Sequence, residues 1–189
     1  MSARRVAALG APIAAALLVC GVALAGKGFT DPPGDVRDWN GPDVVALRLS
    51  SSKTMVTFTV RFAKAPPLRV STREKWVEML LIGIDTPPLG PRPIPDGEWR
   101  GANFALGTHG PSKTGLLVKL AGGGQRQIAR FPIAVEGSTL TFSVSRRALG
   151  NPAWFTLMVA AARETSTESA GGGYDMAPDR GTFRYALNA

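Results

Sequence analysis

Strict alternation of apolar and polar residues is the feature that most constrains the fold of this chain. It is clearest in the stretch TMVTFTVRFA, residues 54–63, and it returns in STLTFSVS, residues 138–145. The apolar members of the first stretch are Val56, Phe58, Val60 and Phe62. Because successive side chains of a β-strand point to opposite faces, a period of two predicts strands with one buried and one solvated face.

Seven further segments have the length and composition of strands. They are residues 43–50, 75–85, 101–108, 115–121, 126–135, 153–162 and 181–187. Glycine, proline and serine clusters separate these segments, as expected for turns. The segment 153–162 is apolar on both faces, which favours a central strand, although a short helix fits the same pattern.

Nine strands without helices between them predict an all-β fold. The expected architecture is an antiparallel β-sandwich of the jelly-roll or immunoglobulin-like kind. One short helical turn is expected at residues 144–151, where Ser145 can cap its start and Gly150 can end it.

The first 25 residues predict a secretory signal peptide. A positively charged start precedes an apolar run, and Ala23 and Ala25 supply the small residues of a cleavage site. An uncleaved membrane anchor and a lipid-modified Cys20 are the alternatives. Cleavage would leave residues 26–189, the size of a single domain, and would remove the only cysteine. We therefore expect a secreted or periplasmic protein with no membrane span after cleavage.

The chain carries a formal net charge of +8 at pH 7, but its basic residues are spread along the sequence. Nucleic-acid-binding proteins usually gather such charge on one face. We therefore expect no nucleic-acid partner. Attraction to an anionic polymer of the cell envelope fits the charge.

Against this basic background, acidic residues gather near both ends of the expected domain. Asp31 and Asp35 come before the first predicted strand, and Asp175 and Asp179 come before the last. If those two strands are neighbours, the four carboxylates converge. Clustered Asp oxygens on irregular segments are ligands that Ca²⁺ prefers. The alternative is that each Asp accepts backbone N–H groups in turns and at the starts of strands.

Two tryptophans, Trp39 and Trp99, lie in loop segments, where burial is not automatic. A sugar site needs a flat aromatic surface beside polar side chains, and these two rings can provide it. The alternative is that each ring simply pins its loop to the sandwich. Trp76 and Trp154 lie in predicted strands and are expected in the core. The predicted ligand-binding residues are Trp39, Trp99, Arg100, Asn103 and Tyr174.

Three stretches together resemble a known group of bacterial secreted domains. They are DPPGDVRDWNGPDVVALRLS at 31–50, LLIGIDT with a Gly/Pro-rich loop and GANFAL at 80–106, and YDMAPDRGTFRYAL at 174–187. The chain resembles the family 9 carbohydrate-binding modules and the wider DOMON-like superfamily over nearly all of the expected mature domain. The resemblance implies an antiparallel β-sandwich that binds a sugar between aromatic side chains, often with structural calcium; other members bind haem.

The resemblance also assigns positions in this chain. The matching residues are Asp31, Gly34 and Asp35 at the start, Asp43 and Asp85 beside predicted strands, and Asp175, Pro178 and Asp179 at the end. Pro87 stands where many relatives have a second acidic residue. Asp85 is therefore not counted among the expected calcium ligands, which are Asp31, Asp35, Asp175 and Asp179.

The sequence does not indicate catalysis. His109 is the only histidine, and no cysteine follows the signal segment, so the usual groups of hydrolytic triads and dyads are missing. Glu78 and Asp85 are an odd number of residues apart, which places them on opposite faces of a strand rather than together as a glycosidase pair.

Haem would need an axial ligand such as His109 together with a methionine, but methionines within strands ordinarily fill the core, and haem is not expected. The prediction is a non-catalytic module that binds a carbohydrate or another envelope ligand. A structural or protein-interaction domain without a small-molecule site is the alternative.

Overall fold

The computed structural model describes residues 26–36, 41–87, 101–121, 124–165 and 173–187. These residues form thirteen strands in two antiparallel sheets, and no helix occurs among them. The predicted all-β antiparallel sandwich is confirmed. Within the described ranges, no helix is long and apolar enough to cross a membrane.

Sheet A has five strands, and sheet B has eight. In spatial order, sheet A consists of β1 (Gly26–Thr30), β2 (Val44–Ser51), β3 (Met55–Phe62), β10 (Thr139–Ser145) and β9 (Ala134–Glu136). Sheet B consists of β12 (Tyr174–Ala177), β11 (Trp154–Thr165), β5 (Trp76–Asp85), β6 (Phe104–His109), β7 (Thr114–Ala121) and β8 (Gly124–Pro132). Two shorter strands complete sheet B: β13 (Phe183–Ala186) pairs with β11, and β4 (Val70–Ser71) pairs with β5.

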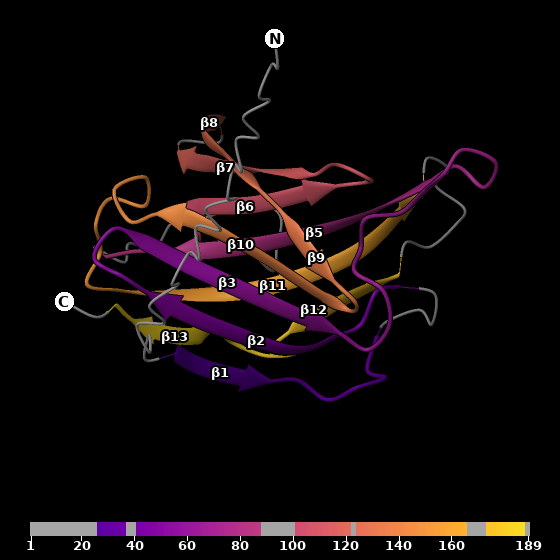
Figure 1. Cartoon of the computed structure of the whole chain (residues 1–189), viewed down its shortest axis with the longest axis horizontal. Helices are drawn as coiled ribbons and strands as arrows, with labels where there is room; N and C mark the ends of the chain where they lie inside the picture. Colours follow the sequence, from indigo (N-terminus) through magenta and orange to yellow (C-terminus); the bar gives the residue numbers. More distant parts are fainter. Residues whose placement is uncertain (1–25, 37–40, 88–100, 122–123, 166–172, 188–189) are drawn as a thin grey trace, which may run out of the picture.

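The two sheets lie one over the other and share a single apolar core (Figure 1). The predicted inward residues of β3 are at most 1% exposed, and those of β10 at most 3%. Phe58 lies at the centre, with its ring 5.2 Å from that of Phe142 and 6.3 Å from that of Phe155 on the opposite sheet. On the outer face of sheet A, the hydroxyls of Thr57 and Ser143 share a hydrogen bond of 2.8 Å. The alternation therefore separates the core from solvent as the sequence predicted.

The structure contains strands that the sequence did not predict. β1, β4 and β12 are short, and β1 has two glycines in the sequence GKGFT, which shows no alternation. The predicted strand at 126–135 is divided into β8 and β9, which pair in different sheets. The division falls after Pro132, which has no N–H with which to continue a ladder.

The short helical turn expected at residues 144–151 is present as a run of i→i+3 turns that ends at Gly150, and not as a regular helix. Ser145 is the last residue of β10, and turns follow it. The N–H groups of Leu149 and Gly150 bond the carbonyls three residues earlier, each at 3.1 Å. This stretch is too short to make a helix.

The beginning and the end of the described chain lie side by side. β1 is an edge strand of sheet A, and β13 pairs with β11 near the facing edge of sheet B. The rings of Phe29 and Phe183 are 4.3 Å apart, and the Lys27 ammonium donates a hydrogen bond of 3.0 Å to the Arg184 carbonyl. These contacts bring the segment after β1 close to the segment between β12 and β13.

The expectation that Trp76 and Trp154 lie in the core is wrong. Both rings are half-buried, and neither belongs to the core cluster. Trp154 takes an outward position on β11 because its neighbour Phe155 takes the inward one. The guanidinium of Arg184 lies 4.1 Å from the Trp154 ring, and that of Arg163 lies 4.2 Å from the Trp76 ring.

The fully buried Phe58 provides a test of the shared core. Phe58→Ala should lower the free energy of unfolding by about 3 to 5 kcal/mol, because it leaves a cavity between the sheets. Met55→Ala is a matched control on the same strand: Met55 is 37% exposed, and its truncation should cost less than about 0.5 kcal/mol. Urea denaturation measures both, and equal losses would contradict this description of the core.

Candidate metal centre

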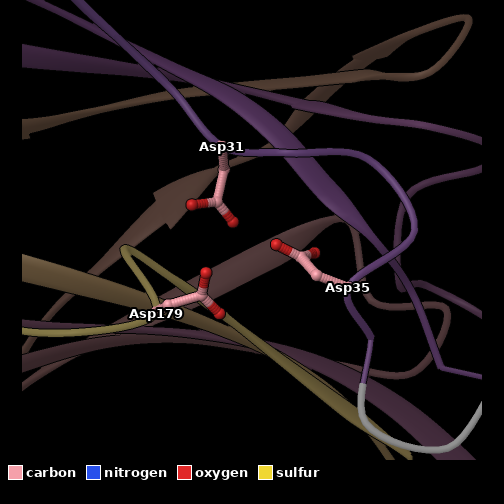
Figure 2. Close-up of side chains that lie close together, drawn as sticks. All are labelled: Asp31, Asp35 and Asp179. Carbon is pink, nitrogen blue, oxygen red and sulfur yellow. The ribbon is translucent and has the colours of Figure 1, made fainter.

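Five carboxylates from two distant parts of the chain converge where sheet A meets sheet B. They belong to Asp31, Asp35, Asp43, Asp175 and Asp179. Oxygens of Asp31, Asp35 and Asp179 lie within 4.8 Å of one another, and so do oxygens of Asp35, Asp43 and Asp175. Figure 2 shows the first three side chains pointing toward one another, two from the purple N-terminal segment and one from the yellow C-terminal loop. Asp35 belongs to both groups and links them.

The turn after β1 positions the N-terminal acids. Gly34 has a φ of +87°, a conformation that glycine adopts easily and other residues rarely do. This turn reverses the chain so that Asp35 faces Asp31. The N–H of Gly34 also donates a hydrogen bond of 2.8 Å to the Asp43 carboxylate, which ties the turn to the start of β2.

A close backbone approach holds the N-terminal segment against β12. A Cβ atom at Gly41 would lie 3.0 Å from the carbonyl carbon of Gly173 and 2.9 Å from the Val36 side chain. Only a residue without a side chain fits there. The residue just before β12 is therefore in contact with the segment that leads into β2.

Asp175 connects the two sheets. It lies in β12 opposite Ala161 of β11, on the inward face of sheet B, and it is only 2% exposed. Its carboxylate accepts a hydrogen bond of 2.6 Å from the N–H of Val44, the first residue of β2 in sheet A. Asp175 precedes the last strand, β13, as expected, but it lies within a short strand of its own, β12, which the sequence did not predict. The two acidic segments meet across the sheets and not through paired strands.

Turn chemistry accounts for only some of the carboxylate oxygens. Asp43 and Asp175 each accept a backbone N–H, as expected if these acids serve turns and strand starts. Four oxygens have no hydrogen-bond partner although they are buried: Oδ2 of Asp31, both oxygens of Asp35, and Oδ1 of Asp43. Leaving such groups unsatisfied is costly, and native structures seldom do so without a bound species.

No basic side chain neutralises the cluster within the part of the chain that the structure describes. The ion pairs there are those of Glu78 with Arg69 and Arg163, and none involves the five carboxylates. Arg180 follows Asp179 directly in the sequence but forms no such pair, and Arg37 lies outside the described residues. The cluster is thus a concentration of negative charge in a basic chain.

The proximity of these acids changes their affinity for protons. Burial, followed by the charges of Asp175, Asp35, Asp179 and Asp43, raises the pKa of Asp31 from 3.8 to about 7. Burial, together with the charges of Asp35 and Asp43, raises the pKa of Asp175 to about 6, although the N–H of Val44 opposes the rise. Burial also raises the pKa of Asp35. Without a cation, some of these carboxyls therefore hold protons near neutral pH.

The donor set suits a hard cation. The two groups contain only carboxylates, with no histidine or cysteine. Ca²⁺ takes about six to eight oxygen ligands in flexible geometry, which carboxylates from two irregular segments can provide. Asp43 was not among the ligands expected from the sequence, although its place at the start of the predicted strand 43–50 matched the family motif.

Of the five predicted carbohydrate-binding residues, the structure describes only Asn103 and Tyr174. Trp39, Trp99 and Arg100 lie outside the described residues. Asn103 is only 6% exposed. Its amide donates hydrogen bonds to the carbonyl and the hydroxyl of Thr86, at 3.1 and 2.9 Å, and accepts one from the Thr86 N–H at 3.1 Å. Asn103 therefore fastens the end of β5 to the start of β6 and is not free to contact a ligand.

Tyr174, the first residue of β12, is half-buried beside Asp175.

Glu78, a member of the carboxylate pair that the sequence argued against, has structural partners. It is fully buried, and its carboxylate binds the guanidinium groups of Arg69 and Arg163 at 2.8 and 2.9 Å. Glu78 faces the core side of β5, whereas Asp85 is half-buried and seven positions along the same strand. The ion pairs join the segment before β5 to β11.

No protein-family model matches the chain, and no curated protein sequence matches it.

The raised pKa of Asp31 predicts how stability depends on pH without metal. Asp31 binds its proton more tightly in the folded protein (pKa about 7) than in the unfolded chain (3.8). The resulting stability is fully present below about pH 4 and is lost as the pH rises through about 7. Between about pH 4 and pH 8, the free energy of unfolding of Asp31→Asn should therefore fall by on the order of 2 kcal/mol less than that of the wild type.

Urea denaturation in chelator between about pH 4 and pH 8 measures the effect. Glu136 is exposed on β9, and Glu136→Gln should leave the dependence unchanged. A wild-type stability that stays level over this range would contradict the raised pKa of Asp31.

Proposed function

We propose that this chain is an exported, non-catalytic binding module whose edge is ordered by Ca²⁺ and whose ligand is a carbohydrate or another component of the cell envelope. The observation that carries the calcium proposal is the set of buried, unpartnered oxygens of Asp31, Asp35 and Asp43. Cations bound within the two overlapping carboxylate groups would replace mutual repulsion with coordination and would give these oxygens partners.

Calcium is favoured over other cations by the chemistry of the donors. Zinc sites are usually built with histidine or cysteine, and neither occurs in these groups. Magnesium demands near-ideal octahedral geometry and usually keeps several waters beside one or two carboxylates. Five carboxylates on two separate segments fit the larger and more adaptable shell of Ca²⁺.

Calcium would act on segments that carry predicted ligand-binding residues. Trp39 lies between Asp35 and Asp43 in the sequence, and Tyr174 directly precedes Asp175. A cation that fixes Asp175 would limit the movement of its neighbour Tyr174, the first residue of β12. Lower mobility in the free protein reduces the entropy lost on binding, which raises affinity.

The carbohydrate part of the proposal depends on sequence. It is supported by the resemblance to carbohydrate-binding modules and by the places of Trp39 and Trp99 between predicted strands in the sequence. A structural or protein-interaction domain is the alternative. Glycan binding by the purified protein separates the two.

Calcium should stabilise the folded protein. At a free concentration of about one hundred times Kd, the gain is about 2.7 kcal/mol, or roughly 5 to 10 °C in Tm for a domain of this size. Asp35→Asn should abolish the response, because Asp35 belongs to both carboxylate groups. Differential scanning calorimetry with calcium, magnesium and chelator measures it. Glu136→Gln should respond like wild type, and a Tm that ignores both calcium and chelator would remove the metal site.

Glycan-array binding tests the ligand class. Trp99→Ala should abolish binding if Trp99 is the sugar platform, while Trp154→Phe should retain it, because Trp154 is already covered by Arg184. No glycan binding by the wild-type protein, together with isolation of a stable protein complex, would favour the structural alternative.

A further inference from the structure

The outer face of sheet B contains a depression of about 390 Å³ over β5, β6, β7 and β8. Its floor is apolar and is made by Met79, Leu81, Ala105, Leu116 and Val118. Its ionisable lining residues are His109 and Arg130. This surface is far along sheet B from β12, and none of the five clustered carboxylates lines it.

Apolar residues at these positions are unusual for a solvent-facing sheet. The outward face of an antiparallel sandwich is normally polar. Sheet A follows this rule, with Thr57, Thr59, Thr141 and Ser143 facing outward. On sheet B, by contrast, Leu116 is 38% exposed while its neighbours across the depression are also apolar. An apolar floor of this kind is typical of a surface that a ligand covers.

The strand registers arrange the floor as a groove. Leu81 pairs with Gly107, Gly107 pairs with Leu116, and Leu116 pairs with Arg130, so these four residues form one row across four strands. Gly107 has no side chain, and the Leu81 side chain leans over this position, where a Cβ atom would lie 3.3 Å from its Cδ1. The row therefore leads from Leu81, over Gly107 and Leu116, to a guanidinium at the outer strand.

The charge of the depression favours an anion. No carboxylate from the described residues lines it, and within those residues Arg130 makes no ion pair. Arg130 is exposed. A guanidinium with free donors binds a carboxylate through two parallel hydrogen bonds.

We propose that this depression binds a single-chain aliphatic carboxylate, with the alkyl chain along Leu81, Gly107 and Leu116 and the head group on Arg130. The volume lies in the range of small-molecule sites, about 300 to 1,000 Å³, and suits one chain. No Trp, Tyr or Phe among the described residues lines the depression, so it does not resemble a sugar platform. The inference names a second ligand class for the proposed binding module and rests on that proposal, but it uses a separate surface from the calcium site.

Titration calorimetry with laurate, below its micelle concentration, tests the proposal. Laurate should bind saturably to the purified protein at one site. Dodecanol, which has the same chain without the charge, should bind at least about tenfold more weakly, because a hydrogen bond to a charged group is lost. Butyrate, which has the head group without the chain, should not bind.

Two exposed positions separate the contributions of head and chain. Arg130→Gln should weaken laurate by about tenfold but leave dodecanol unchanged, whereas Leu116→Ser should weaken both ligands by about tenfold. Arg126→Gln is a matched control: Arg126 is exposed on the same strand but does not line the depression, and its loss should change neither affinity. An equal effect of Arg126→Gln and Arg130→Gln would overturn the assignment of the head group.

Other occupants give different results. Binding to anionic phospholipid vesicles without saturable laurate binding would overturn the proposal. Dimerisation through this face would also overturn it, if the protein does not bind laurate and Leu116→Ser abolishes the dimer. A haem spectrum that depends on His109, in place of laurate binding, would also overturn it.

The calcium response keeps the two proposals apart. A wild-type protein that responds to calcium but ignores laurate rejects this inference alone, whereas a wild-type protein that binds laurate but ignores calcium rejects the metal site alone. Each variant is compared only if it melts cooperatively, as the wild type does.

Discussion

The apolar core shared by the two sheets is the interaction on which the other features depend. Alternate residues of β3 and β10 face those of β5 and β11, and the contact between Phe29 and Phe183 extends apolar packing to the edge. This packing places the segment after β1 opposite β12. The carboxylates are therefore close because burial of apolar surface brings their strands together against electrostatic repulsion.

At both candidate binding surfaces, the usual placement of polar and apolar groups in a β-sandwich is not followed. At the edge, four carboxylate oxygens are buried without a hydrogen-bond partner, and the cluster has no basic partner among the described residues. On the outer face of sheet B, apolar residues occupy positions that are usually polar. Proteins tolerate such departures mainly where function requires them, which is why a cation and an amphiphile are proposed at these two places.

Sequence predicted the parts of the fold that alternation controls. β3 and β10 have clear inward and outward faces, and both were found. β12 was missed because one of its inward residues is Asp175, so the strand carries a carboxylate where an apolar residue is expected. Convergence of the acids was predicted from their positions near the two chain ends. The row from Leu81 to Arg130 could not be predicted from the sequence. It depends on the registers between four strands, which no local sequence pattern specifies.

The two long sides of the sandwich are closed by different means. On one side, β8 leads directly into β9, so the chain itself passes from the edge of sheet B to the edge of sheet A. On the opposite side, sheets A and B meet through the bond from Val44 to Asp175 and through the carboxylate cluster. One side is thus joined by the chain itself, whereas the other is joined by noncovalent contacts that include carboxyl groups with raised pKa values, so only the second side depends on pH.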